Sequence, residues 1–310
     1  MSKIQGQVWF VALAMFMSGM LFSCNKDDDN DDAGTSQYEE PDFPVMGFDD
    51  DGASLALFSV AERVQVRFSR GNLQYQASTD TWRFAEHQYE CVGEANENIS
   101  DTYNGWIDLF GWGTSGWNSG ANAFQPWSVS ADNADYYVGG TWQGGLTGEY
   151  AEADWAWHNA IQNGGGQVHQ WRVLTAEEWR YLLEERTDAA SKRGVASVGG
   201  KHGLVILPDN WTSPDGLEFS PDMQYWMTNT YTKREWSYME AAGAVFLPAA
   251  GSRYGTLVGD VQFEGIYWTS SADDASYVCI VQYEGYDIVP TGYDGRQNGH
   301  SVRPVKGVEN

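Results

Sequence analysis

The chain has 310 residues, of which 43 are acidic and 18 are basic, so its formal charge at pH 7 is −25. This balance argues against nucleic acid as a partner, because phosphate binding requires clustered lysine and arginine. Hydrophobic residues make up 42% of the chain and aromatic residues 15%, including 15 tryptophans. The composition excludes a wholly disordered chain and is sufficient for a large hydrophobic core.

The N-terminus has the features of a bacterial lipoprotein signal peptide. Residues 8–22 carry no charge, and this run is short for a membrane-spanning helix but suits the apolar part of a signal peptide. Leu21 at −3, Ser23 at −1 and Cys24 at +1 resemble the lipobox, in which the cysteine is acylated and becomes the new N-terminus. We therefore expect residues 1–23 to be removed and Cys24 to carry a lipid that attaches the chain to a membrane.

The segment 24–51 is predicted to be an acidic, flexible tether. Residues 25–51 contain 11 acidic side chains and one lysine, Lys26, and a run of like charges repels itself and stays extended. Lys26 and the aspartates after it resemble the surface-export signal of Bacteroidota lipoproteins. The resemblance implies an outer-membrane lipoprotein that faces the cell exterior, and a tether facing the periplasm is the alternative. Residues 52–310 are expected to form a single domain.

Short strands and turns dominate the expected globular part. Residues 64–68, 73–75 and 82–84 are separated by polar turns and predict half-buried antiparallel strands. The Gly/Trp-rich stretch 104–122 follows neither a helical nor a strand period and predicts a compact ordered loop. Tryptophans stacked in the core are favoured there over an exposed binding platform.

Two helices are predicted in the middle of the chain. Thr175 and Glu178 have the spacing of a capping box, so a helix is expected to begin after Thr175 and to run to about Arg186. Residues 151–161 are a weaker helix candidate, which ends at the Asn-Gly-Gly of residues 163–165.

Three antiparallel strands are predicted near the C-terminus, over residues 266–271, 277–283 and 298–305. Cys91 and Cys279 both lie in strand-like contexts, and the sequence leaves open whether they form a disulfide or remain buried thiols. The chain contains no Cys-x-x-Cys motif and its five histidines are scattered, so no metal site and no cofactor are expected.

Four segments together resemble the C-type-lectin-like fold. These are residues 171–179, 251–253, 267–271 and 299–305, in this order. They are similar to segments of formylglycine-generating enzymes, of bacterial repeat domains of the major-paralogue kind and of variable proteins of diversity-generating retroelements. Over roughly residues 60–306 the chain is similar to lipoproteins of gut Bacteroidota. The resemblance implies an α+β fold with short, mostly antiparallel strands, two helices and long Gly/Trp-rich loops, but these motifs do not transfer a function.

The catalytic and calcium-binding motifs of the resembled families do not match this chain. Formylglycine-generating enzymes bind copper through nearby cysteines, whereas Cys91 and Cys279 are far apart in sequence. Sugar-binding lectins hold calcium with Glu-Pro-Asn or Gln-Pro-Asp followed by Trp-Asn-Asp, and residues 125–127 and 209–211 match neither motif. We therefore expect no enzyme activity and find no support for calcium-dependent sugar binding.

The C-terminal loops are predicted to bind a ligand, because residues 267–301 are rich in Tyr, Asp and Asn, the mixture that recognition loops use. An ordinary solvated hairpin is the alternative, since strands favour Tyr and turns favour Asp. The candidate contacts are Arg253, Tyr254, Trp268, Asp273, Asp274, Tyr286, Tyr293, Asp294, Arg296 and Asn298. The sequence thus predicts a cell-surface lipoprotein that binds a protein or glycan ligand. An envelope enzyme acting on glycans and a structural or fimbria-associated surface component are the other hypotheses.

Overall fold

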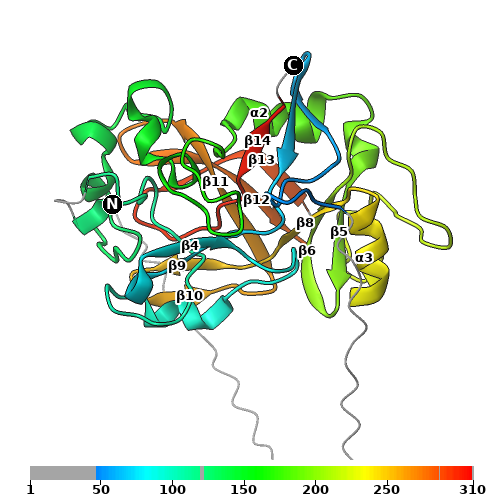
Figure 1. Cartoon of the computed structure of the whole chain (residues 1–310), viewed down its shortest axis with the longest axis horizontal. Helices are drawn as coiled ribbons and strands as arrows, with labels where there is room; N and C mark the ends of the chain where they lie inside the picture. Colours follow the sequence, from blue (N-terminus) through cyan, green and yellow to red (C-terminus); the bar gives the residue numbers. More distant parts are fainter. Residues whose placement is uncertain (1–46, 119–121, 286, 309–310) are drawn as a thin grey trace, which may run out of the picture. The chain divides into compact units, whose positions relative to one another are not determined.

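The computed structural model describes residues 47–118, 122–285 and 287–308, all within one compact unit, Phe43–Asn310. It is an α+β arrangement of short, mostly antiparallel strands with few helices (Figure 1), so the α+β prediction is confirmed. Residues 1–23, which are predicted to be a signal peptide, and Cys24 lie outside the described residues. No helix in the described part of the chain is long and apolar enough to cross a membrane.

The described strands form three sheets and two further hairpins. One sheet has the order β1-β2-β14, with strands Phe58–Ala61, Val64–Phe68 and Val305–Gly307. A second has the order β11-β12-β13, with strands Glu264–Ala272, Tyr277–Glu284 and Asp287–Gly295. A third has the order β7-β5-β6-β8, with strands Thr230–Tyr231, Arg193–Val198, Lys201–Ile206 and Val245–Pro248. The hairpins are β3–β4, Leu73–Gln76 with Thr81–Phe84, and β9–β10, Ser252–Tyr254 with Leu257–Gly259.

Helix α2 forms where the capping box predicts it. It covers Ala176–Arg180 and continues as a π-helical turn, Tyr181–Glu185, so the helix expected to reach about Arg186 is confirmed. The Glu178 N–H donates to the Thr175 hydroxyl, and the Glu178 carboxylate accepts from the Thr175 N–H. The 151–161 prediction holds in part, because this region is a 3-10 helix, Gly148–Ala153, followed by the single turn α1, Trp155–His158.

Helix α3, Lys233–Ala241, was not expected from the sequence. Thr232 and Glu235 form a second capping box at its start. Its buried residues Trp236 and Met239 pack in one cluster with Phe246 of β8, so α3 covers the four-stranded sheet. Figure 1 shows α3 beside strands β5, β6 and β8.

Tryptophans build much of the largest core cluster. In the Gly/Trp-rich loop, Trp112 is fully buried and its indole N–H donates to the Thr269 carbonyl at 3.0 Å. Trp155 and Trp171 are also fully buried, and each indole N–H has an oxygen partner within the protein. These partners offset the loss of the hydrogen bond to water that burial of an indole N–H causes. For Trp112 the expectation of a core position is confirmed.

Residues 47–51 belong to the folded domain, although the sequence analysis assigns them to the tether. The Asp49 carboxylate accepts hydrogen bonds from the backbone of Asp51 and Ala53 and forms an ion pair with Arg67 at 2.6 Å. Asp51 forms an ion pair with Lys306 at 2.8 Å. The prediction that like charges keep residues 47–51 extended is wrong, because Arg67 and Lys306 of the domain form ion pairs with Asp49 and Asp51.

The two cysteines of the domain are not bonded to each other. Cys91 and Cys279 are both free thiols. Burial raises the pKa of the Cys279 thiol to about 11, so this group remains protonated near neutral pH. The question that the sequence left open is therefore answered in favour of two thiols.

Candidate functional site

Three of the predicted ligand contacts are buried. Trp268 and Arg296 have no exposed surface and Arg253 is 1% exposed. The indole N–H of Trp268 donates to the Phe110 carbonyl at 2.6 Å, and its ring centroid lies 4.4 Å from that of His300. The expectation that these three side chains contact a ligand is corrected, because neighbouring chain covers them.

Arg296 holds the turn between β11 and β12 in place. Its Nη1 donates to the carbonyls of Asp274 at 2.9 Å and Ala275 at 3.3 Å, and its Nη2 donates to the Trp142 carbonyl at 2.6 Å. Burial lowers the pKa of its guanidinium below the usual arginine value. Arg296 is therefore a clamp between the turn and the loop that contains Trp142.

Arg253 has a similar structural role. Its Nε donates to the Leu109 carbonyl at 3.2 Å, and its Nη1 donates to the Gly255 carbonyl. Burial lowers the pKa of this guanidinium to about 10, which still leaves it charged near neutral pH. It fixes β9 to the loop that precedes Phe110.

The remaining candidates do not form a single patch. Tyr293 is 57% exposed and pairs with Cys279, whereas the next residue, Asp294, points to the opposite face of β13. On that face the Asp294 carboxylate accepts from Asn298 at 2.8 Å and lies 2.7 Å from His300 Nε2. The other exposed candidates are Tyr254, Asp273 and Asp274. Asn298 is half-buried, and Tyr286 lies outside the described residues.

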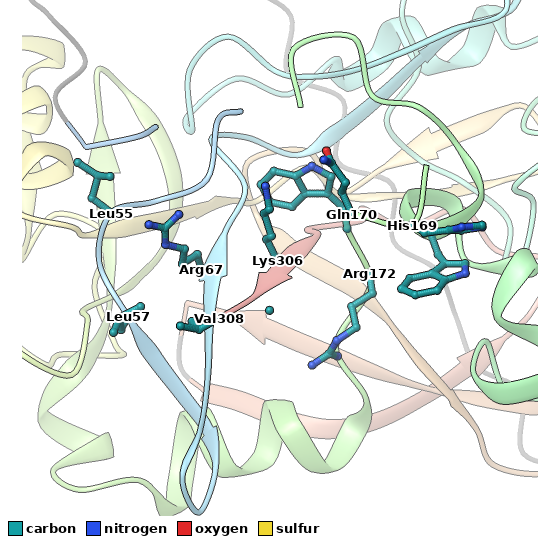
Figure 2. Close-up of a pocket in the computed structure, with 11 residues that line it drawn as sticks. Leu55, Leu57, Arg67, His169, Gln170, Arg172, Lys306 and Val308 are labelled. Atoms are coloured by element: carbon teal, nitrogen blue, oxygen red, sulfur yellow. The ribbon is translucent and has the colours of Figure 1, made fainter. Parts of the chain in front are cut away.

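A cavity of about 720 Å³ lies elsewhere, over β2 and β14 (Figure 2). A second cavity of about 330 Å³ adjoins it, because Trp157 and Arg172 line both. We refer to the two cavities together as the Trp157 groove. The polar and aromatic residues that line the larger cavity are Arg67, Trp157, His169, Gln170, Trp171, Arg172 and Lys306.

The pairing of β2 with β14 places two of these cations together. Lys306 lies opposite Arg67, while their neighbours Val305 and Phe68 are buried. Since side chains alternate along a strand, Arg67 and Lys306 point away from the core and toward the cavity, as Figure 2 shows. Arg172 adds a third cation, because its backbone forms two hydrogen bonds with Val305, at 2.8 and 2.9 Å.

Arg172 is oriented by the start of helix α2. Its Nη1 and Nη2 donate to the two carboxylate oxygens of Glu178 at 2.7 and 2.6 Å. Glu178 is also the glutamate of the capping box. This bidentate geometry fixes the plane of the guanidinium, so the local signal that begins the helix also positions a residue of the groove.

A carboxylate flanked by two imidazoles lies beside Trp157. Glu152 Oε2 is 2.7 Å from His158 Nδ1, and Glu152 Oε1 is 3.0 Å from His169 Nε2. The hydrogen bond from His158 is the main reason that the pKa of Glu152 is lowered. The His169 ring lies 4.9 Å from that of Trp157 and supports it on the side of the larger cavity. Among the described residues, no group of three or more His, Cys, Asp or Glu side chains is arranged to hold a metal ion.

Asp154 lines the smaller cavity and is buried. Burial raises the pKa of its carboxyl to about 6. Its Oδ1 accepts from the Ala156 N–H at 2.9 Å and its Oδ2 accepts from the Val173 N–H at 2.7 Å. Both oxygens are thus engaged with backbone, which indicates a structural role at the start of α1.

No local pattern in the sequence predicts this groove. Its lining comes from chain segments near residues 55, 67, 157, 170 and 306, which only the folded structure brings together. Comparisons with protein-family models, with curated proteins and with solved structures found no match to the chain. The assignment of a function therefore depends on the geometry of the site.

Proposed function

We propose that this chain is a lipid-anchored surface lipoprotein whose C-type-lectin-like domain binds a glycan in the Trp157 groove. The observation that carries the proposal is the pair of adjoining cavities, about 720 and 330 Å³, with the half-buried Trp157 between them. Two cavities that share a wall suit an extended ligand with at least two units. The lipid on Cys24 and the acidic tether would connect this domain to the outer membrane.

The lining has the chemistry that a sugar ring requires. A sugar presents a face of C–H groups and a rim of hydroxyls, so it binds where an aromatic face lies beside planar hydrogen-bonding groups. Trp157 supplies the aromatic surface, and the amide of Gln170 and the guanidinium of Arg172 supply the polar groups. Gln170 lines the larger cavity, and its Oε1 is buried without a hydrogen-bond partner among the described residues.

The geometry favours binding over hydrolysis of the glycan. Most glycoside hydrolases use two carboxyl groups on either side of the scissile bond. Among the described residues that line the two cavities, Asp154 is the only acidic one. Because both of its oxygens accept backbone N–H groups, Asp154 is poorly placed to transfer a proton to a ligand.

The C-type-lectin-like assignment is supported by the position of the residues that carry the resemblance. Trp171, Trp179 and Trp268 have no exposed surface. Motifs made of such residues mark a fold and are compatible with a ligand site elsewhere on the domain.

A glycan-binding screen of the full chain in detergent tests the proposal. We expect the full chain to bind at least one polysaccharide or oligosaccharide and Trp157→Ala to reduce that binding at least tenfold. Trp142→Ala is the matched control, because Trp142 is 39% exposed and does not line the groove. Retention of full binding by Trp157→Ala, or loss of binding in a Tyr277/Tyr293 double alanine variant instead, would place the ligand site outside the groove.

A further inference from the structure

The charged residues that line the larger cavity are all cationic, although the chain as a whole is acidic. The chain has more than twice as many acidic as basic residues. Among the described residues that line the larger cavity, Arg67, Arg172 and Lys306 are cationic and none is acidic. A concave site lined by one sign of charge attracts ligands of the opposite sign.

Arg67 and Lys306 repel each other unless negatively charged groups lie beside them. Like charges directly opposite each other in an antiparallel pair are destabilising. Asp49 and Asp51 offset this cost with ion pairs at 2.6 and 2.8 Å. Each of the two cations therefore already binds one carboxylate of the chain.

Both cations also remain accessible. Their side chains are 29% and 26% exposed, respectively. Asp49 is bound by Nη1 of Arg67, and the other guanidinium nitrogens have no hydrogen-bond partner among the described residues. Lys306 Nζ carries three N–H donors, of which one is needed for Asp51. A ligand can bind these remaining donors without unfolding the 49–51 segment.

We propose that the Trp157 groove recognises a carboxylated glycan, with a uronic acid carboxylate bound between Arg67 and Lys306. This inference rests on the proposed glycan-binding function and specifies its ligand class. Asp51, which is 39% exposed, then acts as a resident competitor for Lys306. Trp157 and Gln170 contact the sugar ring, while the cations select for the charge.

Calorimetric titration of the full chain with acidic oligosaccharides, such as oligogalacturonides and hyaluronan and alginate fragments, tests the inference. Each is paired with its carboxyl-reduced form, which keeps the linkages and loses the charge. We expect at least one acidic form to bind at least tenfold more tightly than its reduced form, with an affinity that falls as salt increases. A sulfated oligosaccharide without carboxylates serves as a third arm and is expected to bind more weakly than the best acidic form.

Variants of Lys306 and of its partner Asp51 test whether the lysine binds the carboxylate. Lys306→Met should weaken binding of the acidic form about tenfold, whereas the matched control Lys201→Met, at an exposed position outside the groove, should not. Asp51→Asn should strengthen binding about threefold, because it removes the competitor while both cations stay in place. Asp51→Asn retains Lys306, so it still tests the inference if Lys306→Met fails to fold.

The outcomes separate this inference from the function on which it rests. Equal binding of acidic and reduced forms, with dependence on Trp157, overturns the carboxylate inference and leaves glycan binding intact. Stronger binding of the sulfated form overturns it in favour of another anion. Binding of no glycan of either kind overturns the proposed function itself.

Discussion

Lys306 and Arg67 lie directly opposite each other on β14 and β2, and two aspartates of one short segment, Asp49 and Asp51, neutralise them. The relationship joins the beginning and the end of the domain at the floor of the Trp157 groove. It explains why Asp49 and Asp51, at the end of the acidic segment, pack against the domain.

Asp49 should matter more for stability than its neighbour Asp50. Asp49→Asn removes the charge that pairs with Arg67 and weakens the hydrogen bonds that the side chain accepts from the N–H groups of Asp51 and Ala53. We therefore expect the free energy of unfolding to fall by about 1–2 kcal/mol. Asp50→Asn is the control, because Asp50 is exposed. Denaturant unfolding of both variants measures the difference, and equal stabilities would show that the 49–51 segment is not fixed by these contacts.

The two capping residues of α2 should separate stability from ligand binding. Thr175→Ala removes the N-cap acceptor and should lower the free energy of unfolding by about 1 kcal/mol, with little effect on glycan affinity. Glu178→Gln should lower both the free energy of unfolding and the glycan affinity, because Glu178 also binds the guanidinium of Arg172. Unfolding curves and calorimetric titrations of the same samples provide the comparison. Loss of affinity in Thr175→Ala equal to that in Glu178→Gln would contradict a specific role for the Arg172 contact.

Arg296 should behave as a buried clamp rather than as a ligand contact. Arg296→Met removes the Arg296 donors to the carbonyls of Asp274, Ala275 and Trp142, and the Ala275 carbonyl keeps its other donors, Asn133 and Tyr137. We expect a loss of about 3 kcal/mol in the free energy of unfolding. Arg63→Met, at a side chain that is 89% exposed, is the control and should change stability little. A variant at position 296 as stable as the wild-type chain would mean that the β11–β12 turn does not depend on this side chain.

Asp154 should make stability depend on pH in a defined window. Burial raises the pKa of its carboxyl from 3.8 to about 6, so the folded state binds a proton more tightly than the unfolded state. Its contribution to stability is therefore largest below pH 4 and is lost as the pH rises through 6, a change on the order of 3 kcal/mol. Asp154→Asn removes this titration. The stability of the wild-type chain relative to Asp154→Asn should decrease between pH 4 and pH 7, and a difference that is constant or increases over this range would contradict the assignment.

Local signals in the sequence predict the elements that depend on local contacts. The Thr175–Glu178 spacing predicts α2 because a capping box requires only four consecutive residues. Thr232 and Glu235 carry the same signal, and α3 could have been predicted from it. The strands predicted over residues 266–271 and 277–283 are β11 and β12. The strand predicted over residues 298–305 is wrong, because the third strand of this sheet is β13 and residues 299–301 form isolated bridges to three different segments.

Side-chain exposure was less predictable than the elements. Arg253 and Arg296 look like surface residues in the sequence, yet each is buried against carbonyl groups of distant loops. The groove depends even more on tertiary structure, because the pairing of β2 with β14 brings Arg67 to Lys306 across most of the chain. Neither the partners of a buried arginine nor the register of distant strands is encoded in a short pattern.

The most direct test of the central claim follows the tryptophan indole N–H signals by NMR during titration of the protein with a glycan that it binds. Loss of one signal in Trp157→Phe identifies the Trp157 indole. The account predicts that this signal shifts in a saturable way while that of Trp142 stays unchanged. A saturable shift of other tryptophans with an unchanged Trp157 signal would show that the groove is not the binding site.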